Sequence, residues 1–122
     1  MAESAPTKVN LSNKLALFSD HWAPRIVGRY NDNEVRLVKA SGDFQWHKHD
    51  DTDELFLVLE GQLVMEFRGS TQTLGAGEMI IVPRGVEHFP RVPEGEVKLL
   101  LMDPRDTPNT GDPETAYRAN EI

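Results

Sequence analysis

Short apolar segments alternate with turn-forming residues between residues 25 and 102, and this even spacing constrains the fold more than any other feature. Gly, Pro, Asn and Asp separate the segments, as in GAG at 75–77 and PRG at 83–85. Short strands at such regular intervals, with almost no helix, are typical of a β-sandwich or a closed barrel. Strands are expected near residues 25–30, 34–40, 43–49, 54–60, 62–68, 71–74, 78–82, 86–91 and 96–102.

The two ends of the chain lack this pattern. Residues 1–10 are polar and residues 104–122 are rich in Pro, Asp, Asn and Thr, so both are expected to form flexible or extended arms. Between the first arm and the strands, Ser12 is expected to cap a short helix that reaches Phe18. A chain of 122 residues has room for one core, so we expect a single domain whose barrel core spans about residues 25–103.

The charge balance and the residue content exclude several classes of function. A formal net charge of −7 argues against nucleic acid or an anionic membrane surface as a partner. The chain has no run of 18 apolar residues, and its start lacks the features of a signal peptide. It also has no cysteine, which removes disulfides, thiolate metal sites and a cysteine nucleophile. We therefore expect a cytoplasmic protein whose ligand is a small molecule.

Some of the expected strands are apolar on both faces. The segments LFLVL at 55–59 and LLLM at 99–102 have no polar side, whereas the interior of a small barrel covers only one face of each strand. An arm of the chain or another subunit must cover the other face. We expect a homodimer that forms through a face of the sheet.

Three of the four histidines fall in two short segments. His47 and His49 lie two residues apart on an expected strand, so their side chains leave the same face. Such a pair alone is more often polar surface than a metal site, and both interpretations stay open at this point. Glu54 begins the next expected strand and could return towards the two imidazoles to add a carboxylate ligand. His88 follows the corner 83–85, whose Pro and Gly could direct the histidine into a barrel.

Together the two segments resemble the two motifs of the cupin superfamily. The first motif, G-x5-H-x-H-x(3,4)-E-x6-G, is matched by His47-x-His49-x4-Glu54-x6-Gly61. The second motif, G-x5-P-x-G-x2-H-x3-N, is matched by Gly77-x5-Pro83-x-Gly85-x2-His88. The chain departs from these motifs at Gly42, which lies one residue nearer to His47, and at Val92, which replaces the final Asn.

The resemblance implies an all-β fold, the double-stranded β-helix or jelly-roll barrel, with one divalent transition metal per chain. Fe, Mn, Ni, Zn, Co and Cu are all compatible with a set of three imidazoles and one carboxylate. An octahedral ion would keep two positions open for a substrate, water or O₂. The implied ligands are His47, His49, Glu54 and His88.

The function expected from this resemblance is that of a metal-dependent enzyme acting on a small metabolite. Oxygenase chemistry is preferred over isomerase or lyase chemistry, because no protein acid or base is recognisable and a redox metal needs the fewest helpers. Some cupin lyases have a tyrosine two residues after the glutamate ligand, where this chain has Phe56. The alternatives are a non-catalytic, metal-dependent binding or sensor protein and a protein in which the metal only stabilises the barrel.

Strand parity predicts which other side chains line the pocket. Gln45 shares the expected face of His47 and His49 and would be the one polar contact in a mostly apolar cavity. No Lys or Arg is expected inside, so an anionic substrate would lack a cationic partner. The expected pocket residues are Gln45, Phe56, Met65, Phe67 and Leu101.

Overall fold

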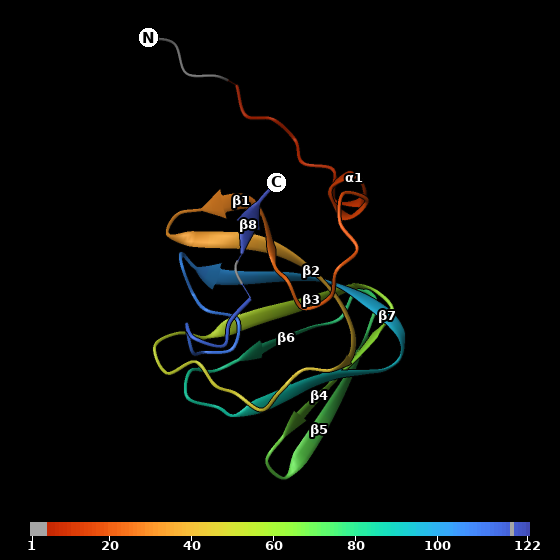
Figure 1. Ribbon diagram of the computed structural model, residues 1–122, viewed down its shortest axis with the longest axis vertical. Helices are drawn as coiled ribbons and strands as arrows, with labels where there is room; N and C mark the ends of the chain where they lie inside the picture. The colour runs from red at the N-terminus through yellow and green to blue at the C-terminus, as the bar shows by residue number, and fades with distance from the viewer. Residues whose placement is uncertain (1–4, 118) are drawn as a thin grey trace.

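The computed structural model describes residues 5–117 and 119–122, which form eight strands and one short helix (Figure 1). The helix α1 spans Leu11–Leu15. The strands are β1 (Arg25–Tyr30), β2 (Asn33–Asp43), β3 (Glu54–Glu60), β4 (Gln62–Phe67), β5 (Ser70–Gly75), β6 (Met79–Val82), β7 (His88–Pro104) and β8 (Asn120–Glu121).

The long strand β7 joins the two layers of the fold, because it pairs with different strands along its length. Its beginning, from His88 to Arg91, pairs antiparallel with β4, its later part pairs with β3, and β2 pairs with both parts. The strand order is β5-β4-β7-β2-β1-β8, and β3 also pairs with β6. Figure 1 shows β4 and β5 splayed away from β1, β2 and β3. The fold is the expected all-β jelly roll, although its strands do not close into a complete barrel.

Three of the expected strands differ from those observed. The segments 86–91 and 96–102 belong to one strand, because β7 continues through residues 93–96, which lie between the paired residues Val92 and Val97. The segment PEG at 93–95 is therefore a bulge and not a break. The expected strand over 43–49 is also wrong, because beyond the end of β2 only His47 pairs, in an isolated bridge with His88.

The helix begins earlier and ends earlier than expected. Asn10 is the N-cap residue, since its side-chain oxygen accepts a hydrogen bond of 3.0 Å from the N–H of Asn13. Ser12 therefore lies inside the helix, and Phe18 lies beyond its end. Leu15 and Phe18 are nevertheless buried against Leu37 of β2, so this segment covers part of the outer sheet face.

The C-terminal segment returns to the body of the fold. After β7 the chain forms a series of turns, and β8 then pairs in parallel with β1 (Figure 1). Gly111 has a φ of +77°, and a Cβ at this position would collide with the carbonyl of Lys48. The segment after β7 therefore packs directly against the segment that carries His47 and His49.

The main core lies between the two layers and is formed by alternate residues of the strands. Val58, Leu63, Met65 and Val97 are fully buried there, and each such side chain contributes about 1.5–3 kcal/mol of transfer free energy. Within the described part of the chain, no helix has the length and apolar character needed to cross a membrane.

Candidate metal centre

His47 and His49 lie in the irregular segment between β2 and β3, and backbone hydrogen bonds hold this segment in place. The N–H of His47 donates to the carbonyl of His88 at 3.0 Å, and the N–H of His88 donates back at 2.9 Å. The N–H of Gly85 donates to the carbonyl of His49 at 2.8 Å. The positions of both histidines are therefore fixed without a regular strand.

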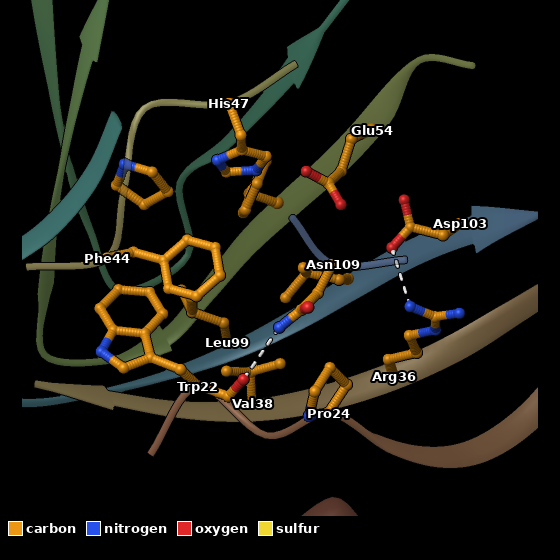
Figure 2. Close-up of a pocket in the computed structure, with 13 residues that line it drawn as sticks. Trp22, Pro24, Arg36, Val38, Phe44, His47, Glu54, Leu99, Asp103 and Asn109 are labelled. Carbon is orange, nitrogen blue, oxygen red and sulfur yellow. Dashed lines mark hydrogen bonds and ion pairs between the residues drawn. The ribbon is translucent and has the colours of Figure 1, made fainter. Parts of the chain in front are cut away.

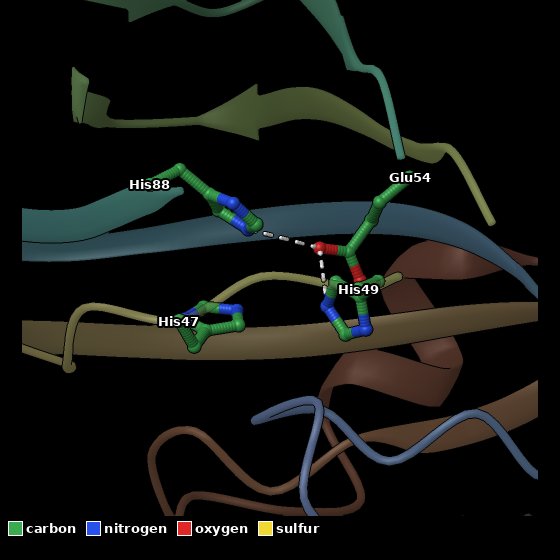
Figure 3. A group of neighbouring side chains, drawn as sticks. All are labelled: His47, His49, Glu54 and His88. Atoms are coloured by element: carbon green, nitrogen blue, oxygen red, sulfur yellow. Dashed lines mark ion pairs between the residues drawn. The ribbon is translucent and has the colours of Figure 1, made fainter. Parts of the chain in front are cut away.

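Glu54 and His88 are the first residues of β3 and β7. The corner at 83–85 leads into β7, and Gly85 adopts a φ of +79°, a backbone conformation that glycine accepts without steric cost. Both strands thus begin at the same end of the fold as the irregular segment with the other two histidines. All four side chains point towards one another there (Figure 3).

The four side chains form a compact, buried cluster. One ligand atom from each of them lies within 4.8 Å of the others, and all four residues are buried. The Oε1 atom of Glu54 is 3.3 Å from Nε2 of His49 and 3.5 Å from Nε2 of His88. The sequence-predicted set of His47, His49, Glu54 and His88 is therefore brought together in space.

Backbone carbonyls determine which imidazole nitrogens face the centre of the cluster. Nδ1 of His47 is 2.9 Å from the carbonyl of Gln45, and Nδ1 of His88 is 2.9 Å from the carbonyl of Val86. A carbonyl only accepts hydrogen bonds, so both Nδ1 atoms carry the proton and both Nε2 atoms present a lone pair. This arrangement is common around metal-bound histidines, where the second nitrogen is held by a hydrogen bond.

Within the described part of the chain, two buried atoms of the cluster have no hydrogen-bond partner, namely Nε2 of His49 and Nε2 of His88. Leaving a buried polar atom without a partner costs about 1–3 kcal/mol. A divalent ion between these nitrogens and the Glu54 carboxylate would satisfy all of them, so the residues present fit a metal ion with nitrogen and oxygen ligands.

The electrostatics of the cluster favour the protonation states that bind metals. Burial and the nearby His88 lower the pKa of His47 to about 4, so its imidazole is neutral at pH 7. Burial alone would raise the pKa of Glu54, but contacts with His49 and His88 outweigh it and hold that pKa well below its usual range. A neutral imidazole and an ionised carboxylate are the forms that coordinate a transition metal.

The cluster borders a narrow cavity between the layers (Figure 2). The cavity has a volume of about 30 Å³, and one water needs about 10–15 Å³ of such a cavity. The cavity therefore has room for a few waters or for the end of a small, flat ligand. Its lining comprises Trp22, Pro24, Arg36, Val38, Phe44, His47, Glu54, Phe56, Pro90, Leu99, Leu101, Asp103 and Asn109.

The five residues expected to line the pocket have different positions. Phe56 and Leu101 do line the cavity. Met65 is fully buried in the core, and Phe67 borders a separate surface hollow near β5 and β6. Gln45 is exposed, because the irregular segment 44–53 does not follow strand parity, and only its backbone carbonyl serves the site.

The cavity also has a polar part that the sequence did not predict. Arg36, Asp103 and Asn109 line it, which corrects the expectation that no Lys or Arg lies inside. One signal was present in the sequence: Glu34 and Arg36 continue the alternate positions occupied by the buried residues Val38 and Ala40 of β2. Charged residues at those positions predict a buried ion pair.

The fold and the site define a class of protein: a two-layered jelly roll that encloses a cluster of three histidines and one glutamate. The family follows from the comparison with known sequences, because the model of the cupin domain matches residues 33–103. The chain belongs to the cupins.

The chain is similar to three known proteins, one of which is a cupin-2 domain containing protein. The chain is 41% identical over 66 residues to the uncharacterized protein YdbB of Bacillus subtilis (strain 168), a match that spans 53% of this chain and 58% of that protein. It is 47% identical to a cupin-2 domain containing protein from Shewanella frigidimarina NCIMB 400, with a TM-score of 0.78 over 80% of this chain and 94% of that one. It is 33% identical to protein NMB1881 from Neisseria meningitidis, with a TM-score of 0.73 over 80% of this chain and 99% of that one.

Proposed function

We propose that this cupin is a metal-dependent enzyme that acts on a small molecule at one divalent transition metal per chain. His47, His49, Glu54 and His88 would hold the metal. The observation that carries the proposal is the pair of buried Nε2 atoms of His49 and His88, which face the Glu54 carboxylate and have no hydrogen-bond partner among the described residues. When bound, such a metal supplies Lewis-acid or redox chemistry at its open positions.

The residues of the chain would bind and shield the substrate. Phe44 packs edge-on against the His47 ring at 5.3 Å between centroids, and Phe56 packs edge-on against the His88 ring at 6.1 Å. These aromatic side chains keep bulk water away from one side of the cluster. A cavity with low polarity strengthens the interaction between the metal centre and a polar group of the substrate.

The structure changes the argument about reaction type. The preference for oxygenase chemistry rests on the lack of a recognisable protein acid or base, but the carboxyl group of Asp103 lines the cavity beside Glu54. Burial and the neighbouring Glu54 carboxylate raise the pKa of Asp103 well above its usual value. A carboxyl group of this kind is a candidate for proton transfer, so isomerase and lyase chemistry join oxygenase chemistry on equal terms.

Elemental analysis of protein purified without chelator tests the metal centre. The wild type is expected to contain about one equivalent of a transition metal per chain, and His49→Ala is expected to lose it. His21→Ala is the matched control, since His21 is exposed, pairs with Glu96 and lies outside the cluster. Equal metal contents in His49→Ala and the wild type, or no metal in the wild type after anaerobic reconstitution with Fe, Mn, Ni and Zn, would reject the proposal.

Turnover then separates an enzyme from a binding protein. Metal-loaded wild type is compared with His49→Ala on a panel of small metabolites, with and without O₂. Turnover that depends on both the metal and O₂ indicates an oxygenase, and turnover that depends on the metal alone indicates an isomerase or a lyase. Ligand binding without turnover across the panel supports the non-catalytic alternative.

We also propose that the protein forms a homodimer through the outer face of β3 and β6. Leu55 pairs with Ile81, and Leu57 pairs with Met79, so four apolar residues share this region. Met79 is 57% exposed and Ile81 is 51% exposed. A second copy related by a two-fold axis would cover both apolar patches at once.

Light scattering tests the dimer. Ile81→Lys is expected to convert it to a monomer, whereas Tyr30→Lys, at another exposed and large side chain, is expected to leave it intact. A monomeric wild type at micromolar concentration, or a dimer that survives Ile81→Lys together with Met79→Lys, would reject this interface.

A further inference from the structure

The corner that leads into β7 is hydrogen-bonded to the segment that carries the first three residues of the cluster. The N–H of Arg84 donates to Oδ1 of Asp53 at 2.9 Å, and the N–H of Gly85 donates to the carbonyl of His49 at 2.8 Å. Asp53 directly precedes Glu54 in the chain. Two adjacent backbone N–H groups of the corner therefore hold the first motif at His49 and next to Glu54.

The same corner also orients the ligand of the second motif. The N–H of Val86 donates to the carbonyl of Pro83 at 3.2 Å, which closes the turn, and the carbonyl of Val86 accepts from Nδ1 of His88 at 2.9 Å. A shift of the corner would thus move His88 relative to His49. Groups that hold metal ligands in place without touching the metal typically change the metal affinity by about 10–100-fold when they are mutated.

The contact between Asp53 and the corner is made by a side chain, so a substitution can remove it. Nε of Arg84 also approaches Oδ1 of Asp53, at 3.4 Å. The side chains of Arg84 and Asp53 are 65% and 53% exposed, so water screens their ion pair and the pair contributes little. The shorter hydrogen bond from the backbone N–H of Arg84 needs only an acceptor oxygen, either charged or neutral.

We propose that Asp53 is a positioning residue of the metal centre: its Oδ1 holds the corner against the first motif, so that the ligands of both motifs converge on one ion. The inference rests on the proposed function, because it requires a metal at the cluster. The four residues that could hold the ion do not include Asp53. Asp53 therefore acts through the backbone of Arg84.

Co²⁺ binding to the metal-free protein tests this inference, because the visible spectrum of Co²⁺ reports both the affinity and the arrangement of the ligands. Asp53→Ala is expected to weaken Co²⁺ binding about tenfold and to change the absorption bands of the bound ion. Asp53→Asn keeps an acceptor oxygen for the N–H of Arg84, so it is expected to keep the affinity and the spectrum of the wild type.

Two control variants separate the hydrogen bond from the charge of the side chain. Arg84→Met removes the guanidinium group but keeps the backbone N–H, and Asp51→Ala removes another exposed carboxylate from the same loop. Both variants are expected to bind Co²⁺ with the affinity and spectrum of the wild type.

Hydrogen exchange in the metal-free protein measures the contact itself, independently of any metal. Exchange at the N–H groups of Arg84 and Gly85 is expected to rise in Asp53→Ala and to stay at the wild-type rate in Asp51→Ala. Unchanged exchange at both positions in Asp53→Ala would mean that Asp53 does not hold the corner, and would reject the inference.

The outcomes separate this inference from the proposed function. A wild type that binds no Co²⁺ rejects the metal centre, and the inference with it. A wild type that binds Co²⁺ while Asp53→Ala matches its affinity and spectrum rejects only the role of Asp53. Equal losses of affinity in Asp53→Asn and Asp53→Ala also reject that role, because the charge and not the hydrogen bond would then matter. If Asp53→Ala does not fold, Asp53→Leu, which also lacks an acceptor, is measured in its place.

Discussion

The two ends of the cavity are built in different ways. At one end, the four residues of the cluster come from two short motifs whose spacing can be read along the chain. At the other end, Arg36 of β2 meets Asp103 of β7 and the carbonyl of Thr107 from the C-terminal segment. The cluster end is therefore encoded by local spacing, whereas the far end exists only through the pairing of strands that are distant in sequence.

The two ends of the cavity also have different roles in the protein. Glu34 lies opposite Asp103 in the register of β2 and β7, and Arg36 joins their two carboxylates. All three residues are buried, so this polar network forms only when the strands are paired. We expect the far end to control folding and the cluster end to control metal binding, and the predictions below test this division.

Replacing Arg36 is expected to have the largest effect on stability. Arg36→Met removes the buried cation that pairs with the Glu34 carboxylate at 2.7 Å, and removing one partner from a buried ion pair costs about 3–5 kcal/mol. Urea denaturation measures this loss in the metal-free protein. The metal content of the variant that still folds is expected to match the wild type, because Arg36 does not contact the cluster.

Arg29→Met is the matched control. Arg29 binds Oε2 of the same glutamate at 2.8 Å, but its side chain is 39% exposed. Water screens an exposed ion pair, so the free energy of unfolding is expected to change much less than in Arg36→Met. Equal losses in the two variants would contradict the assignment of the far end as a buried structural network.

The sequence predicted the cluster end well and the far end poorly, for a physical reason. The ligand set His47, His49, Glu54 and His88 has a fixed spacing, and the structure brings those four residues together even though residues 43–49 do not form the expected strand. Spacing therefore carried more information than secondary structure. Asp103 was missed because its contacts depend on the register of β7 against β2, which places it opposite Glu34 and which no local spacing in the sequence reveals.

The N-terminal helix shows the limit of local reasoning in a different way. Both Asn10 and Ser12 are good N-cap residues, and the choice between them depends on which side chain reaches a free backbone N–H. The jelly roll, the short helix and the apolar segments that form the strands could all be predicted. The packing of the C-terminal segment could not, because its composition has no periodicity and its contacts are with distant residues.

Acid is expected to destabilise the metal-free protein through the cluster end. The pKa of His47 is about 4 in the folded state and 6.5 in the unfolded state, so the unfolded state binds more protons between these values. The free energy of unfolding is then highest above pH 6.5, and it falls by about 3 kcal/mol as the pH is lowered towards 4. Urea denaturation at a series of pH values between 7 and 4 measures the slope.

His47→Asn provides the comparison for this pH dependence. The variant lacks the group that gains a proton on unfolding, so its slope between pH 6.5 and 4 is expected to be smaller than that of the wild type. His21→Asn, at the exposed histidine outside the cluster, is expected to keep the wild-type slope. A wild-type slope that survives His47→Asn would show that the cluster end does not set the acid sensitivity.

Metal binding is expected to stabilise the fold from the cluster end by a slightly smaller amount. A free metal concentration 100 times the dissociation constant adds about 2.7 kcal/mol to the free energy of unfolding, so the melting temperature is expected to rise on loading and to fall again on chelation. His49→Ala lacks one ligand and is expected to show almost no response to either treatment. A rise of the same size in His49→Ala would mean that the metal stabilises the protein at another place.

The smallest effect is expected at Gly111, which lies where the two ends are joined. The segment after β7 supplies Thr107 and Asn109 to the far end, and at Gly111 it packs against the carbonyl of Lys48, between the two histidines of the first motif. Gly111→Ala places a methyl group against that carbonyl at a φ of +77°, and we expect a loss of about 2 kcal/mol from backbone strain and displacement together. Gly69→Ala has a similar φ of +93° with open space around its Cβ, so it is expected to show only the strain, about 1 kcal/mol.

Hydrogen exchange should then rise across residues 105–117 and around Lys48 in Gly111→Ala alone. If the two variants behave alike, the C-terminal segment does not couple the two ends of the cavity. Folding stability and metal binding would then be set by separate parts of the molecule.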